Sequence, residues 1–94
     1  SDEQVAQTAK KDNDLRDLVS KLATTTVSQG YKMKDIEKLS GAIRSYVLKT
    51  YGDKFISDDR SLKQLLQVNA PNVRGGEVDT WVGRILYPAE YAKY

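Results

Sequence analysis

The sequence contains neither cysteine nor histidine. Without cysteine, the chain has no disulfide, no thiolate ligand for a metal and no thiol nucleophile. Without histidine, it lacks the commonest general base, the commonest metal ligand and the usual partner of a catalytic serine. We therefore expect a protein that is not an enzyme and that uses no cofactor or metal. A chain without cysteine also suits the reducing cytoplasm, where we expect this protein to act.

Long apolar runs are missing as well. No stretch approaches the roughly 18 apolar residues of a membrane-spanning helix, and residues 1–29 mix charged with apolar residues instead of forming the apolar segment of a signal peptide. We therefore expect no membrane partner. Hydrophobic residues make up 39% of the chain, which is too many for a disordered protein. The length of 94 residues fits one domain, so we expect a single helical domain over 1–94, with 1–12 frayed.

Apolar residues recur at helical spacing along most of the chain, whereas strand-like alternation never exceeds three or four residues. The pattern predicts helices over about 3–27, 33–50, 58–68 and 77–87, and a short last helix over 89–94. Ser1 and Gln4 have the spacing of a capping box, and Gly30 and Gly52 are typical C-terminal stops. The predicted fold class is all-α, a compact bundle or orthogonal array of four helices plus a short C-terminal helix.

The segment Lys32–Lys49 resembles the helix-turn-helix motif with which bacterial repressors bind DNA. Such motifs place a glycine in the turn between two short helices, and Gly41 has that position here. Ile36 lies five residues before the glycine and Val47 six after it, where apolar side chains would pack the two helices together.

The resemblance implies that Arg44, Ser45 and Lys49 would point towards bases and phosphates. Glu37 departs from it, because the motif favours a small apolar residue at this position. The alternative is one continuous helix from about 33 to 50 that tolerates Gly41, and the uninterrupted apolar stripe favours that alternative.

Positive charge is concentrated in the middle of the chain. Residues 31–75 carry nine Lys/Arg and five Asp/Glu, whereas the segments before and after each have one more acidic than basic residue. A polyanion would be met by this middle segment. The candidate nucleic-acid contacts are its basic residues Lys34, Lys38, Arg44, Lys49 and Arg74.

The connection between the third and fourth predicted helices is a further candidate. Leu62–Leu86 reads as two helices, but the link of about 68–76 is longer than the three or four residues of a helix-turn-helix. Gly75 and Gly76 precede a helix and would expose backbone N–H groups to an anion beside Arg74. The segment lacks the Lys-Ser/Thr of a phosphate loop, and the alternative is glycine used for turn geometry.

Aromatic and acidic residues give the remaining candidates. Trp81 is expected to anchor the core. Tyr87, Tyr91 and Tyr94 recur at i, i+4 and i+7, so they form one face that either docks a partner or closes back on the bundle. The acidic sets lack the spacing of a calcium loop and are interpreted as caps or solvated faces; they are Asp12, Asp14 and Asp17, and Asp58 with Asp59.

Two functions follow from these features. The first is nucleic-acid binding, in particular DNA binding, through the basic middle segment. The alternative is a protein-interaction or assembly module that uses the tyrosine face or the first helix, and that forms homo-oligomers or binds a foreign protein. The sequence ranks nucleic-acid binding slightly first, because the excess of four positive charges over residues 31–75 favours it mildly. The near-neutral net charge of +2 for the whole chain fits the interaction module.

Overall fold

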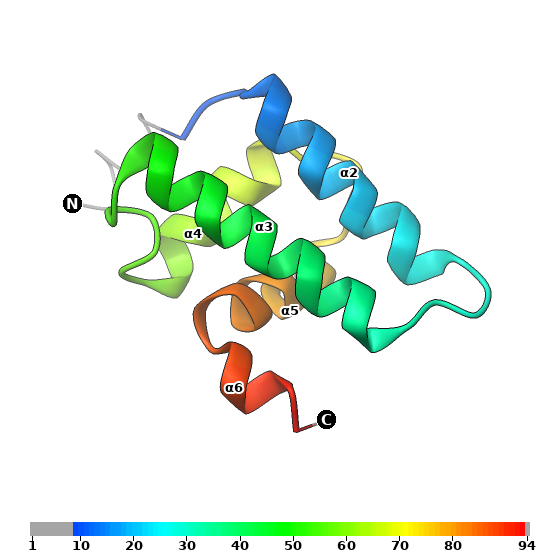
Figure 1. Ribbon diagram of the computed structural model, residues 1–94. Helices are drawn as coiled ribbons and strands as arrows, with labels where there is room; N and C mark the ends of the chain where they lie inside the picture. Colours follow the sequence, from blue (N-terminus) through cyan, green and yellow to red (C-terminus); the bar gives the residue numbers. More distant parts are fainter. Residues whose placement is uncertain (1–8, 94) are drawn as a thin grey trace.

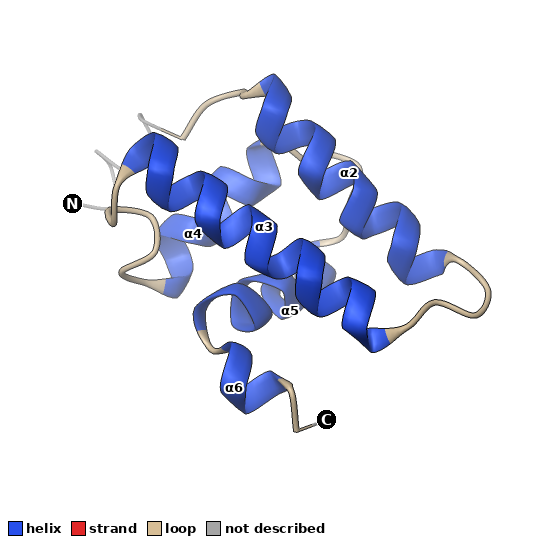
Figure 2. Ribbon diagram, viewed as in Figure 1, coloured by secondary structure: helices blue, strands red, loops and turns tan. Residues whose placement is uncertain are grey.

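The computed structural model describes residues 9–93, which fold into five helices (Figure 1). They are α2 (Asn13–Val27), α3 (Met33–Tyr51), α4 (Asp59–Val68), α5 (Gly75–Leu86) and α6 (Pro88–Tyr91). Over these residues the chain consists of helices and loops without a strand (Figure 2). The prediction of an all-α fold with four helices and a short C-terminal one is confirmed.

The first described helix starts later than the sequence pattern predicts. α2 begins at Asn13 because the Asp12 carboxylate accepts hydrogen bonds from the backbone N–H groups of Asp14 and Leu15, which makes Asp12 the N-cap. Residues 9–12 are not helical, so the predicted helix over 3–27 is wrong in that stretch, while its end at residue 27 is confirmed. The predicted capping box of Ser1 and Gln4 lies outside the described residues.

α2 and α3 form an antiparallel hairpin, visible in Figure 1 as the two long helices that lie side by side. The link between them contains Gly30 at a φ of 75°, and α3 ends at Gly52 with a φ of 71°. Both values lie in the left-handed region, which glycine adopts without steric cost. Gly52 is the C-cap of α3, so that predicted stop is confirmed, whereas α2 ends at the C-cap Ser28 and Gly30 lies two residues beyond it in the link.

α3 is one unbroken helix of 19 residues. Ile36, Ile43 and Val47 are buried along one side, and burying each such side chain stabilises the fold by about 1.5–3 kcal/mol. That gain outweighs the roughly 1 kcal/mol cost of Gly41 within the helix. The chain does not turn at Gly41, so the helix-turn-helix interpretation of Lys32–Lys49 is wrong and the continuous helix is confirmed.

α5 is the central helix, since it packs against α3, α4 and α6. Trp81 is the largest fully buried side chain, as predicted for a core anchor. The core contains apolar residues of α2 to α5 and of the two connections around α4. Its buried members are Leu15, Val19, Leu22, Ile36, Ile43, Val47, Phe55, Leu62, Leu65, Leu66, Ala70, Val78, Trp81, Val82 and Ile85.

The ends of the last two helices differ slightly from prediction. α5 begins at Gly75 with Arg74 as N-cap, so both glycines lie in its first turn and neither has a positive φ. The interpretation of this pair as loop glycines is therefore wrong. α6 begins at Pro88, which suits the first helical position because its missing N–H has no partner there anyway. None of the described helices is long and apolar enough to cross a membrane.

Candidate nucleic-acid interface

Three of the five predicted basic contacts lie together on α3. Lys34, Lys38 and Lys49 are exposed, and a helix of 3.6 residues per turn places them within about 60° of one another, opposite the buried stripe. We call these three residues the lysine face. At a rise of 1.5 Å per residue the face extends for about 22 Å along the helix.

The lysine face is accessible, and its lysines form no ion pair with the described residues. Between its lysines lie the small exposed residues Gly41, Ala42 and Ser45, and a β-carbon at Gly41 would have no neighbour within 4 Å. Lys63 pairs with Asp79 and Lys93 with Glu90, whereas no lysine of this face forms an ion pair within residues 9–93. A flat anionic surface can therefore approach the middle of α3, where the side chains are small, and contact Lys34 at one end of the lysine face and Lys49 at the other.

Arg44 does not belong to the lysine face. It lies on the side of α3 that faces α5, where it is half-buried and its Nη1 donates a hydrogen bond of 2.8 Å to the carbonyl oxygen of Ile85. This carbonyl lies in the last turn of α5, where no later backbone N–H of the helix can donate to it. The guanidinium thus caps α5, a role that its position in the sequence did not reveal.

Arg74 is exposed but lies on another element. As the N-cap of α5 it is next to Gly75, whose backbone approaches the Lys63 side chain of α4. No contact in the described part of the chain joins Arg74 to the lysines of α3. The structure therefore brings together three of the five predicted basic residues and separates the other two.

Two residues of the predicted tyrosine face, Tyr87 and Tyr91, make contacts within the fold, although Tyr87 is 48% exposed. The Tyr87 hydroxyl donates a 2.8 Å hydrogen bond to Asp59 Oδ1, and this bond raises the pKa of Tyr87 above its ordinary value. Tyr91 lies against Gly83, where an added methyl group would overlap its hydroxyl, and its ring centroid is 5.6 Å from the Arg84 guanidinium carbon. Tyr94 lies outside the described residues.

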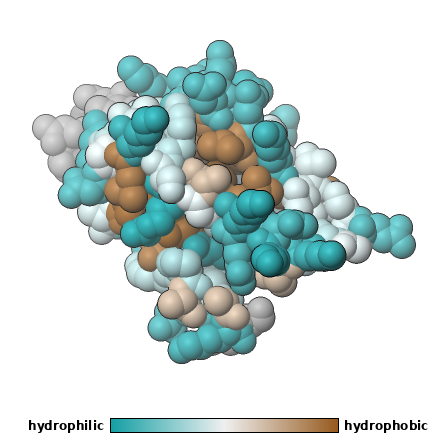
Figure 3. All heavy atoms as spheres, viewed as in Figure 1, coloured by the Kyte–Doolittle hydropathy of each residue, from teal (hydrophilic) through white to brown (hydrophobic). Residues whose placement is uncertain are grey.

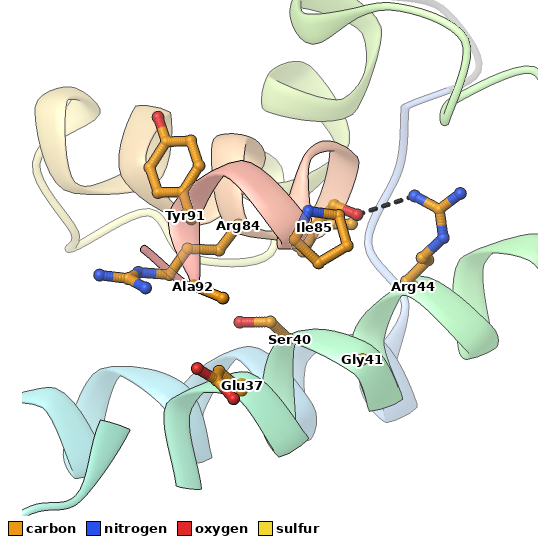
Figure 4. A pocket seen from close by; sticks show the side chains of 9 residues that line it. Glu37, Ser40, Gly41, Arg44, Arg84, Ile85, Tyr91 and Ala92 are labelled. Atoms are coloured by element: carbon orange, nitrogen blue, oxygen red, sulfur yellow. Dashed lines mark hydrogen bonds between the residues drawn. The ribbon is translucent and has the colours of Figure 1, made fainter. Parts of the chain in front are cut away.

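A small cleft remains between α3 and the α5–α6 corner (Figure 4). In this view Ser40 and Glu37 of α3 lie opposite Ala92 and Arg84. The cleft has a volume of about 60 Å³, which suits one apolar side chain of a partner rather than a cofactor. Its place beside Tyr91 links it to the partner-binding surface that the sequence suggested.

Sequence reasoning missed a polar cluster around Asp12. The Asp12 carboxylate accepts hydrogen bonds from the Tyr46 hydroxyl at 2.7 and 2.8 Å and from the Tyr51 hydroxyl at 2.5 Å. Because Asp12 also caps α2, one carboxylate joins the start of α2 to the second half of α3. The sequence pattern predicts a cap or a solvated face for Asp12, and the cap is confirmed, but nothing in the local sequence indicates the tyrosine partners.

Asn69 extends this cluster to α4. Its Oδ1 accepts a 2.8 Å hydrogen bond from the backbone N–H of Asp12, and its Nδ2 donates to the carbonyl oxygens of Leu65 and Lys10. Asn69 is only 2% exposed, so leaving its side-chain amide group without these partners would be costly. The cluster therefore fixes the segment before α2 against the C-terminal end of α4.

The cluster shifts the pKa values of its members in opposite directions. Burial acts to raise the pKa of Asp12, but the hydrogen bonds from Tyr51, Tyr46 and the backbone N–H groups of Leu15 and Asp14 outweigh it, so this pKa lies below its ordinary value. The hydrogen bond to Asp12, followed by burial, raises the pKa of the Tyr46 hydroxyl. Burial, followed by the hydrogen bond to Asp12, raises that of Tyr51. A carboxylate with low pKa between two protonated phenols stabilises the fold but is a poor general base.

The described residues thus define an all-helical domain with an exposed lysine face, and no three Asp or Glu residues between 9 and 93 gather as metal ligands. The chain matches no protein-family model, and no curated protein or solved structure matches it.

Proposed function

We propose that this chain is a non-enzymatic cytoplasmic module that binds nucleic acid through the lysine face of α3. The observation that carries the proposal is the alignment of Lys34, Lys38 and Lys49 on one exposed surface, without an ion pair to any described residue. The absence of cysteine supports the cytoplasmic assignment.

Phosphate contact rather than base reading suits this surface. Lysine carries a compact ammonium group on a flexible side chain, so it neutralises phosphate in many geometries. It lacks the planar guanidinium group with which arginine donates two hydrogen bonds to guanine. The residues between the lysines are too short to reach far into a groove. The module would therefore bind with little sequence preference and with strong dependence on salt.

The α4–α5 pair is a poorer candidate for the same task. α5 lies in the core, and its exposed charged residues are the acidic Glu77 and Asp79, which would repel phosphate. α3 also exposes two acidic residues, but it exposes three lysines beside them. Placing this helix in a DNA groove would also require exposing Trp81 and its apolar neighbours. This argues for α3 as the binding element.

The test is a titration of labelled duplex and single-stranded oligonucleotides at low and at physiological salt. Replacing Lys34, Lys38 and Lys49 together by glutamine should weaken binding at least about tenfold at low salt, because three phosphate contacts are lost. The matched control replaces Lys10, Lys11 and Lys93, which are exposed elsewhere and remove the same charge. Equal losses in the two variants would contradict a specific role for α3.

We propose protein binding at the cleft between α3 and the α5–α6 corner as the second candidate function, supported by its apolar residues Ile85, Pro88 and Ala92. Ala92 is exposed at its edge, so Ala92→Arg should block the cleft without unfolding the core. Light scattering of the intact chain and of this variant tests self-association at the cleft. A monomer in both cases would exclude it at the concentrations used.

A further inference from the structure

The open groove between α2 and α3 is lined by Lys21 and Thr25 from α2 and by Asp35, Lys38, Leu39 and Ala42 from α3. We call it the α2–α3 groove. It has a volume of about 450 Å³, within the range of roughly 300–1,000 Å³ over which small-ligand pockets fall. Figure 3 shows apolar atoms between the two helices, bordered by hydrophilic side chains.

The charges along this groove are not balanced in pairs. Lys21 and Lys38 line it from opposite helices, and within residues 9–93 neither forms an ion pair. Two ammonium groups on the two sides of one groove repel each other, and an anion between them removes that repulsion. Asp35, one helical turn before Lys38, also lines the groove and offsets one of the two positive charges, so the lining keeps a net charge of +1 that favours a phosphate.

The bottom of the groove suits a different chemical group. Leu39 is half-buried and Ala42 is small, so together they offer an apolar surface to the flat face of a base. A base inside a duplex is stacked and paired, and it cannot enter such a groove without being flipped out at a cost of a few kcal/mol. An unpaired base in a single strand enters at much lower cost.

We propose that the α2–α3 groove holds single-stranded nucleic acid, with a phosphate between Lys21 and Lys38 and the adjoining base on Leu39 and Ala42. Lys38 belongs both to the groove and to the lysine face, so the strand continues along α3 towards Lys34 and Lys49. This inference rests on the proposed function and narrows its ligand class to unpaired strands.

The test measures fluorescence anisotropy of a short labelled single strand of mixed sequence and of a hairpin duplex of the same composition. Lys21→Gln should weaken binding of the single strand at least about threefold at low salt, because one phosphate contact is lost. Lys11→Gln, which removes the same charge from the exposed segment before α2, is the matched control and should leave the affinity almost unchanged.

A second variant separates shape from charge. Ala42→Leu raises the floor of the groove at an exposed helical position, so the fold should be retained, as circular dichroism and thermal unfolding will show. It should weaken binding of the single strand several-fold and binding of the duplex less, because a duplex inserts no base into the groove. DNA and RNA strands are compared in parallel, because the phosphate and base chemistry are common to both.

The outcomes distinguish the assignment of the α2–α3 groove from the proposed function of the lysine face, on which it rests. Equal affinities for the Lys21→Gln and Lys11→Gln variants, or tighter binding of the duplex than of the strand, would overturn the groove assignment and leave the lysine face standing. No binding of either nucleic acid at low salt would overturn both. Competition by poly-glutamate as strong as that by the unlabelled strand would show recognition of an acidic polypeptide, which also overturns the assignment.

Discussion

Asp12 connects more of the molecule than any sequence pattern around it suggests. Its carboxylate caps α2 and accepts hydrogen bonds from Tyr46 and Tyr51, while its backbone N–H donates to Asn69. Hydrogen bonds to a charged acceptor contribute about 1.5–3 kcal/mol when buried, and less where, as here, the group is partly solvated. The start of α2 is therefore held by contacts to residues 34 to 57 positions away.

Removing one of these contacts should reduce stability measurably. We expect Tyr51→Phe to lower the free energy of unfolding by about 1 kcal/mol, because it deletes one hydrogen bond to Asp12 and leaves the ring packed edge-on against Phe55. Urea denaturation followed by circular dichroism measures the change. An unchanged midpoint would show that this hydrogen bond contributes nothing to stability.

The pH dependence of stability should follow the lowered pKa of Asp12. The stability due to this carboxylate is fully present above the unfolded pKa of about 3.9 and is lost as the pH falls through the lower folded pKa. The wild type should therefore lose more stability than Asp12→Asn between about pH 5 and pH 2. The pKa of Asp58 is also lowered, by its hydrogen bonds to Ser61. Because Asp58 is present in both proteins, its contribution to the pH dependence of stability cancels in the comparison. Parallel pH curves for the two proteins would contradict this account.

Gly83 and Tyr91 form a second residue-scale pair. A methyl group at Gly83 would overlap the Tyr91 hydroxyl, so Gly83→Ala should destabilise the protein by about 1–3 kcal/mol through overpacking. In a Tyr91→Ala background the obstacle is gone, and the same substitution should become neutral or stabilise α5 by up to about 1 kcal/mol. A thermal-unfolding double-mutant cycle measures both effects. Additive effects would mean that the two residues do not touch in solution.

At the scale of elements, the apolar stripes predicted which segments are helical, and local chemistry set where most of them end. The stripe of α3 runs past Gly41 on the buried side, so the helix continues although a glycine and a motif-like spacing suggested a turn. The sequence pattern predicts the start of α2 too early, although it indicates a cap or a solvated residue at Asp12. The bonds of Asp12 to Tyr46, Tyr51 and Asn69, which are distant in sequence, are not visible in the local pattern.

The distinction between a pattern within one helix and a contact between helices also separates the site residues that could be predicted from those that could not. Lys34, Lys38 and Lys49 share a face because helix periodicity alone fixes their directions. Arg44 is only a few residues away, yet it caps α5, and that contact depends on how two helices pack. Sequence reasoning locates charge on one helix but not the partner that a side chain finds on another.

Gly41 provides a test of the continuous helix. It lies on the exposed side of α3 with no neighbour within 4 Å of an added β-carbon, so Gly41→Ala should raise the free energy of unfolding by about 0.5–1 kcal/mol. Chemical denaturation measures this increase, and Gly52→Ala serves as the contrasting variant. Gly52→Ala should destabilise the protein, because its φ of 71° disfavours any residue with a β-carbon. Destabilisation by Gly41→Ala would indicate a turn at that position.

At the scale of the whole molecule, the net charge is only +2, but the charged residues are distributed unevenly. The core and the Asp12 cluster hold α2 and α3 side by side, and this arrangement presents the lysine face and the α2–α3 groove on one hairpin. At the C-terminal corner Tyr91 packs against Gly83, and Tyr87 is hydrogen-bonded to Asp59 although it is 48% exposed.

The most direct test of the lysine face is the salt dependence of nucleic-acid affinity. Each neutralised phosphate contributes about −0.7 to the log–log slope on single strands and about −0.9 on duplex DNA. The slope of the variant with glutamine at 34, 38 and 49 should therefore be less steep than that of the wild type by about 2 to 3. The variant with glutamine at 10, 11 and 93 should retain the wild-type slope. If both variants keep that slope, or if the wild type binds no nucleic acid at low salt, the lysine face is not a nucleic-acid interface.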